Sequence, residues 1–485
     1  MPLEARSSSL ASELVARFLR THNYTETLDV FLREAGLPAT AGQSRRGEDD
    51  SWTIEGVLAE KRAFDKSVNF ERYNESDKEK DFWSEPAPSS PTVIQTPTSS
   101  NLLCCSVERW QHGDESEQQP EALLVATGAD KQLHLFETST GNELVRSSST
   151  SESPILSYTL IRQGKLVFLT NMSGQLLLQR GSNVVDRRKD HAKYAVKVVA
   201  HEADEAVWIA TAGWDAKVFV YRLRSSLLNG DSPVTIGEPV AQISLPTNPE
   251  SIVFVRHVDT QELLLLVSRR DSTYIYYYQV ESRVSTTTDT PPQQSRECVL
   301  LAQQNLAPHS NAWVAFSPAC MALSPHDPGL IAIATSTLPH MKVMIVRLLF
   351  PATETQSVDV AGAGAPETQA TQALAALSLQ NREDAAIMVQ ANTFAPQTAY
   401  STPQIVWRPD GSGVWVNGDD GVIRGLEAKS GRLVSVLKEG HEPGCKIRAI
   451  WAGWVELPGS KGEVAREEWL VSGGFDKRLV VWKIV

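Results

Sequence analysis

The feature that most constrains this 485-residue chain is a short unit that recurs along it: an apolar run, a turn that carries aspartate, and a second apolar run. Five copies align as LLVATGADKQLHLFET, VWIATAGWDAKVFVYRL, LLLLVSRRDSTYIYYYQV, GVWVNGDDGVIRGLEA and WLVSGGFDKRLVVWKIV. Their turn aspartates are Asp130, Asp215, Asp271, Asp420 and Asp476, and six residues after each stands Phe136, Tyr221, Tyr277, Leu426 or Trp482. β-Branched and aromatic runs separated by turns predict strands, and a recurring unit predicts a repeat fold.

This spacing resembles that of the WD repeat, in which a turn aspartate and a strand-borne tryptophan lie at this distance; the last copy keeps the tryptophan, Trp482. Weaker copies near 166–178 and 331–348 bring the total to seven. The resemblance implies a mainly β fold, a seven-bladed WD-repeat β-propeller over residues 102–485, at about 40 to 45 residues per blade. The Thr-, Pro- and Gln-rich stretch 282–297 and the Ala- and Gly-rich stretch 351–373 are expected to be mobile insertions.

The last residues, 473–485, alternate as a strand does, and a strand edge normally needs a partner for its free backbone groups. In WD-type propellers the chain typically ends on the third strand of the last blade, and the fourth strand comes from before the first blade. Residues 84–101 form a Pro-, Ser- and Thr-rich linker that Val93 and Ile94 interrupt. We therefore expect a propeller-closing strand near 93–96.

Residues 7–37 carry leucines and phenylalanines at helical spacing on either side of a Thr-His-Asn-Tyr break, which predicts two short helices and a turn. A unit this small cannot bury its apolar stripe alone, so self-association is expected. The stretch resembles the LisH motif in Leu14, Phe18, Leu19, Tyr24, Thr27, Phe31 and Glu34, which implies a homodimerising helix-turn-helix over 1–40. The dimerisation residues are then Leu10, Leu14, Phe18, Leu19, Tyr24, Leu28, Phe31 and Leu32. A charged helix is expected over 51–83.

Two sets of polar residues match the hydrogen-bond network with which WD repeats pin their strands together. They are His441, Ser472, Asp476 and Trp482 in the last unit, and His201, Thr211, Asp215 and Tyr221 in a second copy. Histidine, aspartate and serine are also the ingredients of a hydrolase triad. The repeat spacing favours the structural role, which predicts a loss of stability on mutation.

Trp214 and Phe475 each stand one residue before the turn aspartate of their unit. Large aromatic residues exposed on a propeller face are candidates for partner-binding anchors. The alternative is that each ring packs against the neighbouring blade.

Composition and charge narrow the function classes. With 41% hydrophobic and 21% charged residues the chain is typical of soluble globular proteins, and no apolar run approaches the roughly 20 residues that cross a bilayer. Five cysteines without metal-ligand spacing are expected to be reduced thiols in a cytoplasmic or nuclear protein. A net charge of -12 disfavours direct binding of nucleic acid. No phosphate loop, nucleophile elbow or metal-binding His pair occurs, so no cofactor, metal, catalytic residue or membrane partner is expected.

Taken together, these features favour a non-catalytic dimeric scaffold that binds protein or peptide partners through its propeller. The combination resembles LisH plus WD-repeat proteins of the lissencephaly and corepressor type. One alternative is a subunit or substrate receptor of a ubiquitin-ligase complex. Another, from a different class, is a propeller enzyme with a site in the central channel.

Overall fold

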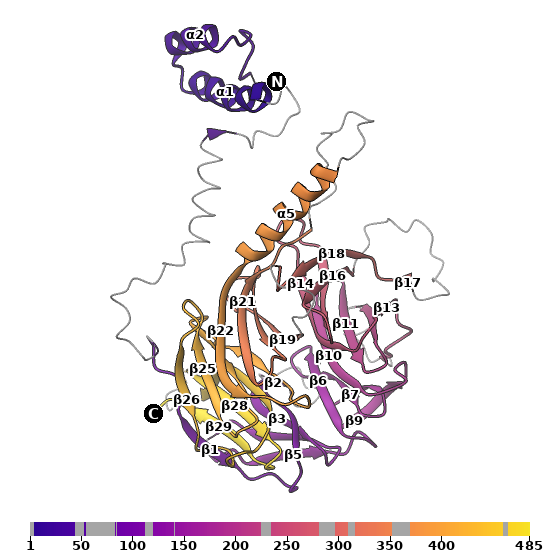
Figure 1. Cartoon of the computed structure of the whole chain (residues 1–485). Coiled ribbons are helices and arrows are strands. Elements are labelled where there is room, and N and C mark those ends of the chain that lie inside the picture. The colour runs from indigo at the N-terminus through magenta and orange to yellow at the C-terminus, as the bar shows by residue number, and fades with distance from the viewer. Residues whose placement is uncertain are drawn as a thin grey trace. The chain divides into compact units, whose positions relative to one another are not determined.

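The computed structural model describes residues 4–43, 53–54, 83, 85–111, 120–139, 141–224, 234–280, 296–308, 316–351, 369–458 and 464–485 (Figure 1). The chain divides into two compact units, Met1–Lys78 and Glu79–Val485. Each unit is described by itself below. None of the helices within these ranges is long and apolar enough to span a bilayer.

The N-terminal unit contains two helices, α1 (Glu4–Thr21) and α2 (Thr25–Glu34), joined by a turn in which Asn23 adopts a positive φ of 58°. The predicted helix-turn-helix is therefore confirmed. The core of the unit consists of Ala16, Leu28, Leu32 and Ala41, with Leu19, Phe31 and Leu37 packed partly against it. This small core is consistent with the burial problem that the sequence poses.

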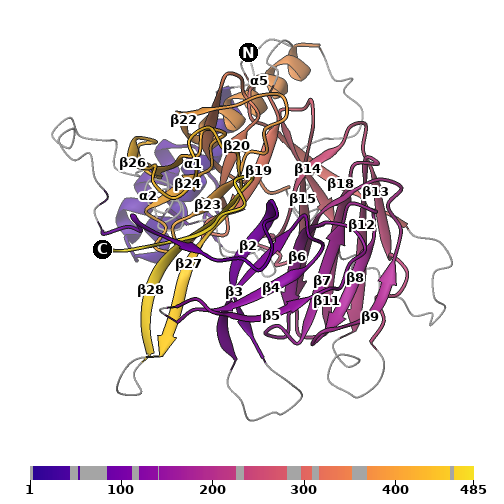
Figure 2. The same cartoon turned by 90° about the horizontal axis from the view of Figure 1, so that it is seen from below.

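The C-terminal unit is a seven-bladed propeller, as predicted, with each blade a mainly four-stranded antiparallel sheet (Figures 1 and 2). Blade 1 consists of β2 (Leu102–Trp110), β3 (Glu121–Gly128), β4 (Leu133–Glu137) and β5 (Leu144–Ser148). Blade 2 consists of β6 (Ile155–Ile161), β7 (Leu166–Asn171), β8 (Leu176–Arg180) and β9 (Asn183–Arg188). Blade 3 consists of β10 (Ala195–Glu202), β11 (Ala206–Gly213), β12 (Lys217–Arg224) and β13 (Ala241–Ser244), with β17 (Arg296–Glu297) added in parallel.

The remaining blades follow the same order. Blade 4 consists of β14 (Pro249–Arg256), β15 (Leu263–Arg269), β16 (Tyr274–Gln279) and β18 (Leu300–Asn305). Blade 5 consists of β19 (Pro318–Leu323), β20 (Leu330–Thr335), β21 (His340–Arg347) and β22 (Ile387–Pro396). Blade 6 consists of β23 (Ile405–Trp407), β24 (Gly413–Val416), β25 (Ile423–Glu427) and β26 (Leu433–Leu437). Blade 7 consists of β27 (Ile447–Pro458), β28 (Val464–Gly474), β29 (Leu479–Lys483) and β1 (Ser90–Ile94).

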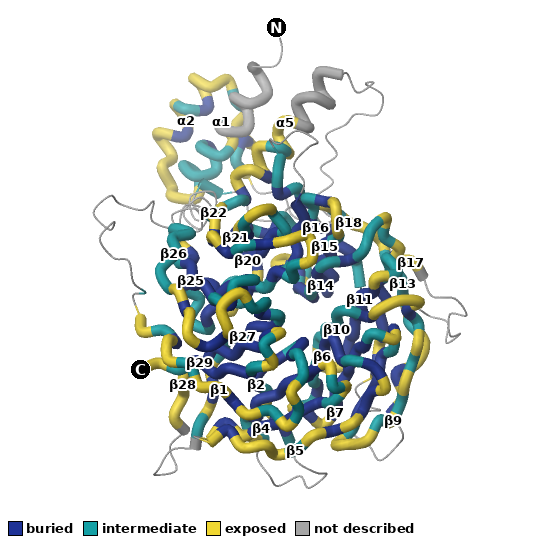
Figure 3. Tube along the Cα trace, turned by 60° about the horizontal axis from the view of Figure 1, so that its bottom comes forward, coloured by how far each residue is buried: buried dark blue, intermediate teal, exposed yellow. Residues whose placement is uncertain are grey.

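Burial follows strand position within a blade. The second strands, such as β7 and β11, are buried at every residue, while the outermost strands β5 and β9 expose many of theirs, as Figure 3 shows in dark blue and yellow. A strand sandwiched on both faces reads as a continuous apolar run, which is why these segments stand out in the sequence. The residues six positions after the turn aspartates lie on the third strands and are fully buried: Phe136, Tyr221, Tyr277, Leu426 and Trp482.

Ring closure joins the two ends of the propeller. β1 pairs antiparallel with β29, so that Val93 lies opposite Val480 and Ile94 opposite Leu479. The closing strand spans 90–94 rather than the expected 93–96. Pro91 does not prevent the pairing, because β1 is the edge of its sheet and a proline without an N–H is tolerated there.

Trp83 anchors the chain to the propeller just before the closing strand. The predicted charged helix over 51–83 lies outside the described residues except at 53–54 and at Trp83, which is not helical. The Trp83 ring centroid lies 4.7 Å from the Arg408 guanidinium and 5.6 Å from the Trp415 ring centroid. A Cβ atom at Gly413 or Gly425 would come within 2.1 Å or 2.7 Å of the Trp83 ring, so both glycines are needed to leave space for it.

Trp415, Arg408, Gly413 and Gly425 surround the Trp83 ring and are called the Trp83 slot below. Arg408 of this slot takes part in a buried ion pair. Arg408, 1% exposed, donates to both carboxylate oxygens of Glu468 at 3.0 and 2.7 Å, and also to the Pro86 carbonyl oxygen at 2.9 Å. A buried guanidinium is tolerated only when its donors are satisfied in this way. The segment before β1 is thus fixed by stacking and by hydrogen bonding.

The two predicted insertions have different outcomes. Residues 282–295 of the stretch 282–297 lie outside the described residues, and 296–297 form β17. The stretch 351–373 was expected to be a mobile loop throughout. Its last residues instead begin the helix α5 (Gln369–Ala386), for which an alanine- and glutamine-rich sequence has good intrinsic propensity.

Replacing Ile94 by alanine tests the role of the closing strand. Ile94 is 6% exposed and packs in the core between blades 7 and 1, so Ile94→Ala should lower the free energy of unfolding by about 2 to 5 kcal/mol in urea titrations. Val93→Ala on the same strand is the control, because Val93 is 44% exposed and should cost less than about 1 kcal/mol. Equal losses in both variants would contradict the assigned register.

Replacing Trp83 by alanine tests the slot. Because the partly buried ring contacts Trp415 and Arg408, Trp83→Ala should destabilise the propeller by about 2 kcal/mol in the same assay. Trp454→Ala is the matched control, since Trp454 is 38% exposed and contacts the Arg466 guanidinium. A smaller effect at Trp83 than at Trp454 would show that the slot contributes nothing to stability.

Candidate interaction site

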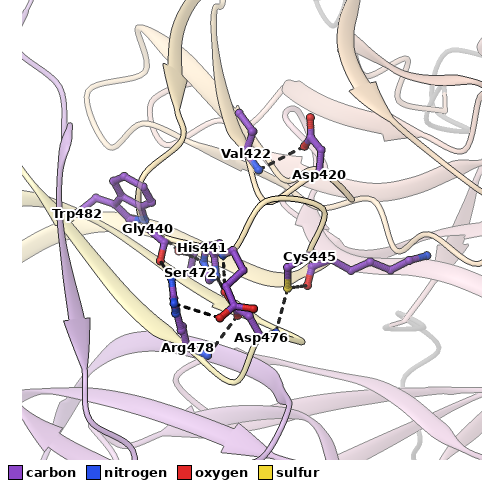
Figure 4. Close-up of polar contacts among 11 residues, drawn as sticks. Asp420, Val422, Gly440, His441, Cys445, Ser472, Asp476, Arg478 and Trp482 are labelled. Atoms are coloured by element: carbon purple, nitrogen blue, oxygen red, sulfur yellow. Dashed lines mark hydrogen bonds and ion pairs between the residues drawn. The ribbon is translucent and has the colours of Figure 1, made fainter.

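A chain of polar contacts ties the last blade together at the turn between β28 and β29 (Figure 4). His441 Nδ1 lies 3.0 Å from an Asp476 carboxylate oxygen, and His441 Nε2 lies 2.8 Å from Ser472 Oγ. The Trp482 indole N–H donates to the same Ser472 Oγ at 2.9 Å. All four predicted residues of this set are therefore brought together.

The direction of these bonds follows from what each group can donate. Because an indole nitrogen only donates, Ser472 Oγ accepts from Trp482 and directs its own proton to His441 Nε2. The Nδ1–H of a neutral His441 then donates to Asp476, which satisfies every group. Ser472 is 0% and His441 2% exposed, so this serine is not accessible as a nucleophile. Gly474 is required here, since its Cβ would lie 2.9 Å from His441 Nδ1.

The same contacts perturb the ionisation of Asp476. Burial raises the pKa of its carboxyl group. Hydrogen bonds from His441 and from the backbone N–H groups of Glu442 and Arg478 outweigh that effect and bring the pKa down to about 2. The folded state therefore favours the carboxylate.

A second set of this kind lies in blade 3, with one correction to the predicted residues. His191, not His201, occupies the histidine position: its Nδ1 lies 2.9 Å from Asp215 Oδ1 and its Nε2 2.9 Å from Thr211 Oγ1. The Tyr221 hydroxyl donates to Asp190 at 2.9 Å and is also hydrogen-bonded to the Thr211 side chain. His201 lies within β10, whereas the histidine must come from the loop that precedes the inner strand, as His441 does before β27.

Other turn aspartates have different partners. Asp130 in blade 1 contacts His134 Nε2 at 2.7 Å, and Asp420 in blade 6 forms an ion pair with Arg424 at 2.7 Å; each partner lies four residues later. The Asp271 backbone N–H donates to Ser317 Oγ at 2.9 Å. Blades 1, 4 and 6 thus hold their turn aspartates by contacts that differ from the histidine–aspartate pair of blades 3 and 7, which explains why only part of the WD pattern is visible in the sequence.

The two candidate anchors, Trp214 and Phe475, occupy equivalent turns and are 43% and 42% exposed. Neither ring is enclosed by a neighbouring blade. The Trp214 backbone N–H donates to the Tyr194 carbonyl oxygen, and that of Phe475 to the Lys446 carbonyl oxygen, each at 2.9 Å. Both rings are therefore presented by a turn that is bonded to the loop before the inner strand of the same blade.

Trp214 has an aromatic partner, Tyr194, that no sequence pattern predicts. The Tyr194 ring lies with its centroid 5.2 Å from that of Trp214, at an interplanar angle of 31°, and is 41% exposed. The two residues are twenty positions apart and belong to no periodic run. Only the expectation that the loop before β10 meets the turn after β11 could have paired them.

The predicted dimerisation residues separate into two groups. Leu28 and Leu32 are buried within the N-terminal unit itself. Leu14, Phe18, Leu19 and Phe31 are half-buried, Tyr24 is 52% exposed, and the Leu10 side chain lies outside the described residues. The centroid of the Phe18 ring lies 4.4 Å from that of the His22 ring, at an interplanar angle of 32°.

The central channel was the alternative place for a site. Cys104 and Cys320 lie on the inner strands of blades 1 and 5, and the charges of Lys197 and Arg448, on the inner strands of blades 3 and 7, lower the pKa of both thiols. Burial raises the pKa of both thiols despite these cations. A thiol whose pKa is raised is a poor nucleophile at neutral pH. Within the described ranges, no three His, Cys, Asp or Glu side chains gather to hold a metal.

The fold therefore defines a class of protein: a LisH-type helix pair joined to a β-propeller. A family model described as UCP007778, beta-propeller domain, matches residues 115–483, and one described as UCP007778, LisH domain, matches residues 12–43. The first match covers more than half of the chain, which therefore belongs to the UCP007778 family. No curated protein sequence matches the chain significantly.

The contacts of Asp476 with His441, and of His441 with Ser472, are called the polar pin of blade 7. Replacing Asp476 by asparagine tests the structural role of this pin. Because the folded-state pKa of about 2 lies below the ordinary value near 4, the carboxylate stabilises the fold above pH 4, and this contribution is lost as the pH falls toward 2. Asp476→Asn should therefore cost about 2 kcal/mol at pH 7, and its difference from the wild type should shrink between pH 4 and 2. Unfolding titrations across this range measure it, with the exposed Asp259→Asn as control. A pH-independent difference would contradict the assignment.

Proposed function

We propose that this protein is a non-catalytic dimeric scaffold, which self-associates through its LisH motif and binds protein partners through its propeller. The observation that carries the proposal is the pair of exposed aromatic rings, Trp214 and Tyr194, held on pinned loops of a rigid ring of sheets. Large aromatic residues on rigid loops contribute contact area at small entropic cost.

Self-association is supported by what the N-terminal helices leave uncovered. Phe18, Leu14 and Phe31 remain only half-buried after the two helices have packed together. A second copy of the helix pair would cover them and complete a four-helix unit. Dimerisation would then present two propellers at once, which raises the avidity for a partner that carries repeated or paired motifs.

The enzyme alternative finds little support. The Ser472–His441–Asp476 set is buried, and burial raises the pKa of the inner-strand cysteines Cys104 and Cys320. The ubiquitin-ligase alternative is one form of scaffold and shares the same surfaces. Affinity purification with mass spectrometry distinguishes it, because ligase components would then co-purify with the dimer.

Replacing Phe18 by aspartate tests self-association. The wild-type chain should run as a dimer by light scattering, and Phe18→Asp should make it monomeric, because a charge at a half-buried interface position must be desolvated without a partner. Thr25→Asp places the same charge at the exposed start of α2 and should leave the dimer intact. A monomeric wild type, or a Phe18→Asp variant that remains dimeric, would reject the LisH interface.

A further inference from the structure

Two equivalent turns on the propeller can be compared directly, because both are held by a histidine–aspartate pin. Next to Trp214 lies a depression of about 500 Å³, lined by Met172, Ser173, Lys189, Ala192, Lys193, Tyr194 and Trp214. Next to Phe475 lies one of about 410 Å³, lined by Glu442, Pro443, Gly444, Cys445, Lys446, Phe475 and Asp476. The first contains two rings and the second only one.

The charges at the two turns also differ. The lining of the Trp214 depression includes two lysines and no carboxylate, and both Lys189 and Lys193 are exposed. Neither lysine forms an ion pair with a residue in the described part of the chain. At the other turn, Lys446 is already paired with Asp419 at 3.0 Å, and Glu442 adds a negative charge. A cationic aromatic surface on a chain of net charge -12 is a local exception.

The Trp214 surface is preorganised. The His191–Asp215 pair and the bond from the Ala192 N–H to Asp215 Oδ2, at 2.9 Å, fix the loop that carries Lys189, Lys193 and Tyr194. On its other side this loop packs against the turn of blade 2: a Cβ at Gly174, where φ is +78°, would lie 2.4 Å from the Lys193 carbonyl oxygen. A surface held from both sides loses little entropy when a partner binds.

Charge and shape limit what this surface can bind. Two adjacent rings could hold a cation, but two lysines beside them oppose one. Single-stranded nucleic acid also stacks on aromatic rings, yet it needs a basic groove along its backbone, and the protein as a whole repels phosphates. An anionic peptide needs only a few charges on either side of one apolar side chain.

We propose that Trp214, Tyr194, Lys189 and Lys193 form a docking site for an acidic peptide segment of a partner protein. An apolar or aromatic side chain of the peptide lies on the Trp214 and Tyr194 rings, and flanking carboxylates lie near the two lysine ammonium groups. His191 is a positioning residue that holds the loop. This inference rests on the proposed scaffold function and identifies which of the two candidate anchors, Trp214 rather than Phe475, binds the partner.

The test is a selection of random dodecapeptides displayed on phage against the full-length protein, followed by binding titrations of the selected peptides by fluorescence anisotropy. The peptides should be enriched in Asp and Glu around a Leu, Phe, Tyr or Trp. Trp214→Ala, or Lys189→Glu together with Lys193→Glu, should weaken their binding about tenfold or more, whereas the matched variant Phe475→Ala should not change it. Raising the salt from 50 to 500 mM should weaken wild-type binding several-fold.

The other outcomes distinguish the acidic-peptide site from the proposed scaffold function. Peptides that are basic or neutral, or that bind Trp214→Ala as well as the wild type, overturn the acidic-peptide site. If they depend on Phe475, the scaffold function stands and only this site is rejected. A library from which the wild type retains nothing overturns both claims. Binding of a labelled single-stranded oligonucleotide that is lost in Trp214→Ala would reassign the surface to nucleic acid, and preference for phosphoserine over Glu in matched peptides would reassign the anion from carboxylate to phosphate.

The variants need one control for folding. Trp214, Lys189 and Lys193 are exposed, so their replacement should leave the unfolding midpoint close to that of the wild type. His191→Ala should instead lower both the midpoint and the affinity, because it removes the pin as well as the loop geometry. A His191→Ala variant that keeps full affinity would overturn the positioning role.

Discussion

The pairing of β1 with β29 is the contact on which the rest of the propeller depends. Every blade packs its faces against two neighbours, so a ring of sheets is stable only when the last blade meets the first. Without β1, the outer edge of β29 would present a row of unpaired backbone groups to solvent. Ile94 ties this pairing to the core between blades 7 and 1, and Trp83 fixes the approach of the chain to it.

Within the closed ring, the polar pins of blades 3 and 7 fix the geometry of the loops before the inner strands. The imidazole of His191 or His441 reaches from the loop before an inner strand to the turn between the second and third strands of the same blade. A buried carboxylate is costly alone but stable when it accepts several hydrogen bonds, so these pins hold the loop in one geometry. In blade 3 that loop carries Tyr194 and the two lysines; in blade 7 it carries Glu442 and Lys446. One structural device therefore supports two chemically different surfaces.

Most of the propeller could be predicted from the sequence, because its strands and turns have local sequence patterns. The aspartate and the residue six positions later are set by the geometry of a single hairpin, and all five copies were found. Contacts between distant segments have no such signature. The predicted set contains His201 where the structure has His191, because both histidines precede Asp215 and only the loop position distinguishes them. Trp83 is a lone aromatic residue in a charged stretch, and the two glycines that admit it lie more than 300 residues away. The apolar residues Val93 and Ile94 predict the closing strand, but not its start at Ser90, because proline and serine are typical of a linker.

The closing strand β1 is synthesised long before the strand with which it pairs. β1 leaves the ribosome long before β29, because the two partners Val93 and Val480 are 387 positions apart and that length takes roughly 20 to 80 s to make at typical elongation rates. During that interval the nascent propeller is an open arc whose first strand has no partner. Pro91 removes one backbone donor from that strand, and the exposed side of β1 is short, so the waiting segment offers neighbouring polysomes little to pair with. The weak strand character of the Ser-Pro start of β1 thus limits what the unfinished chain can pair with.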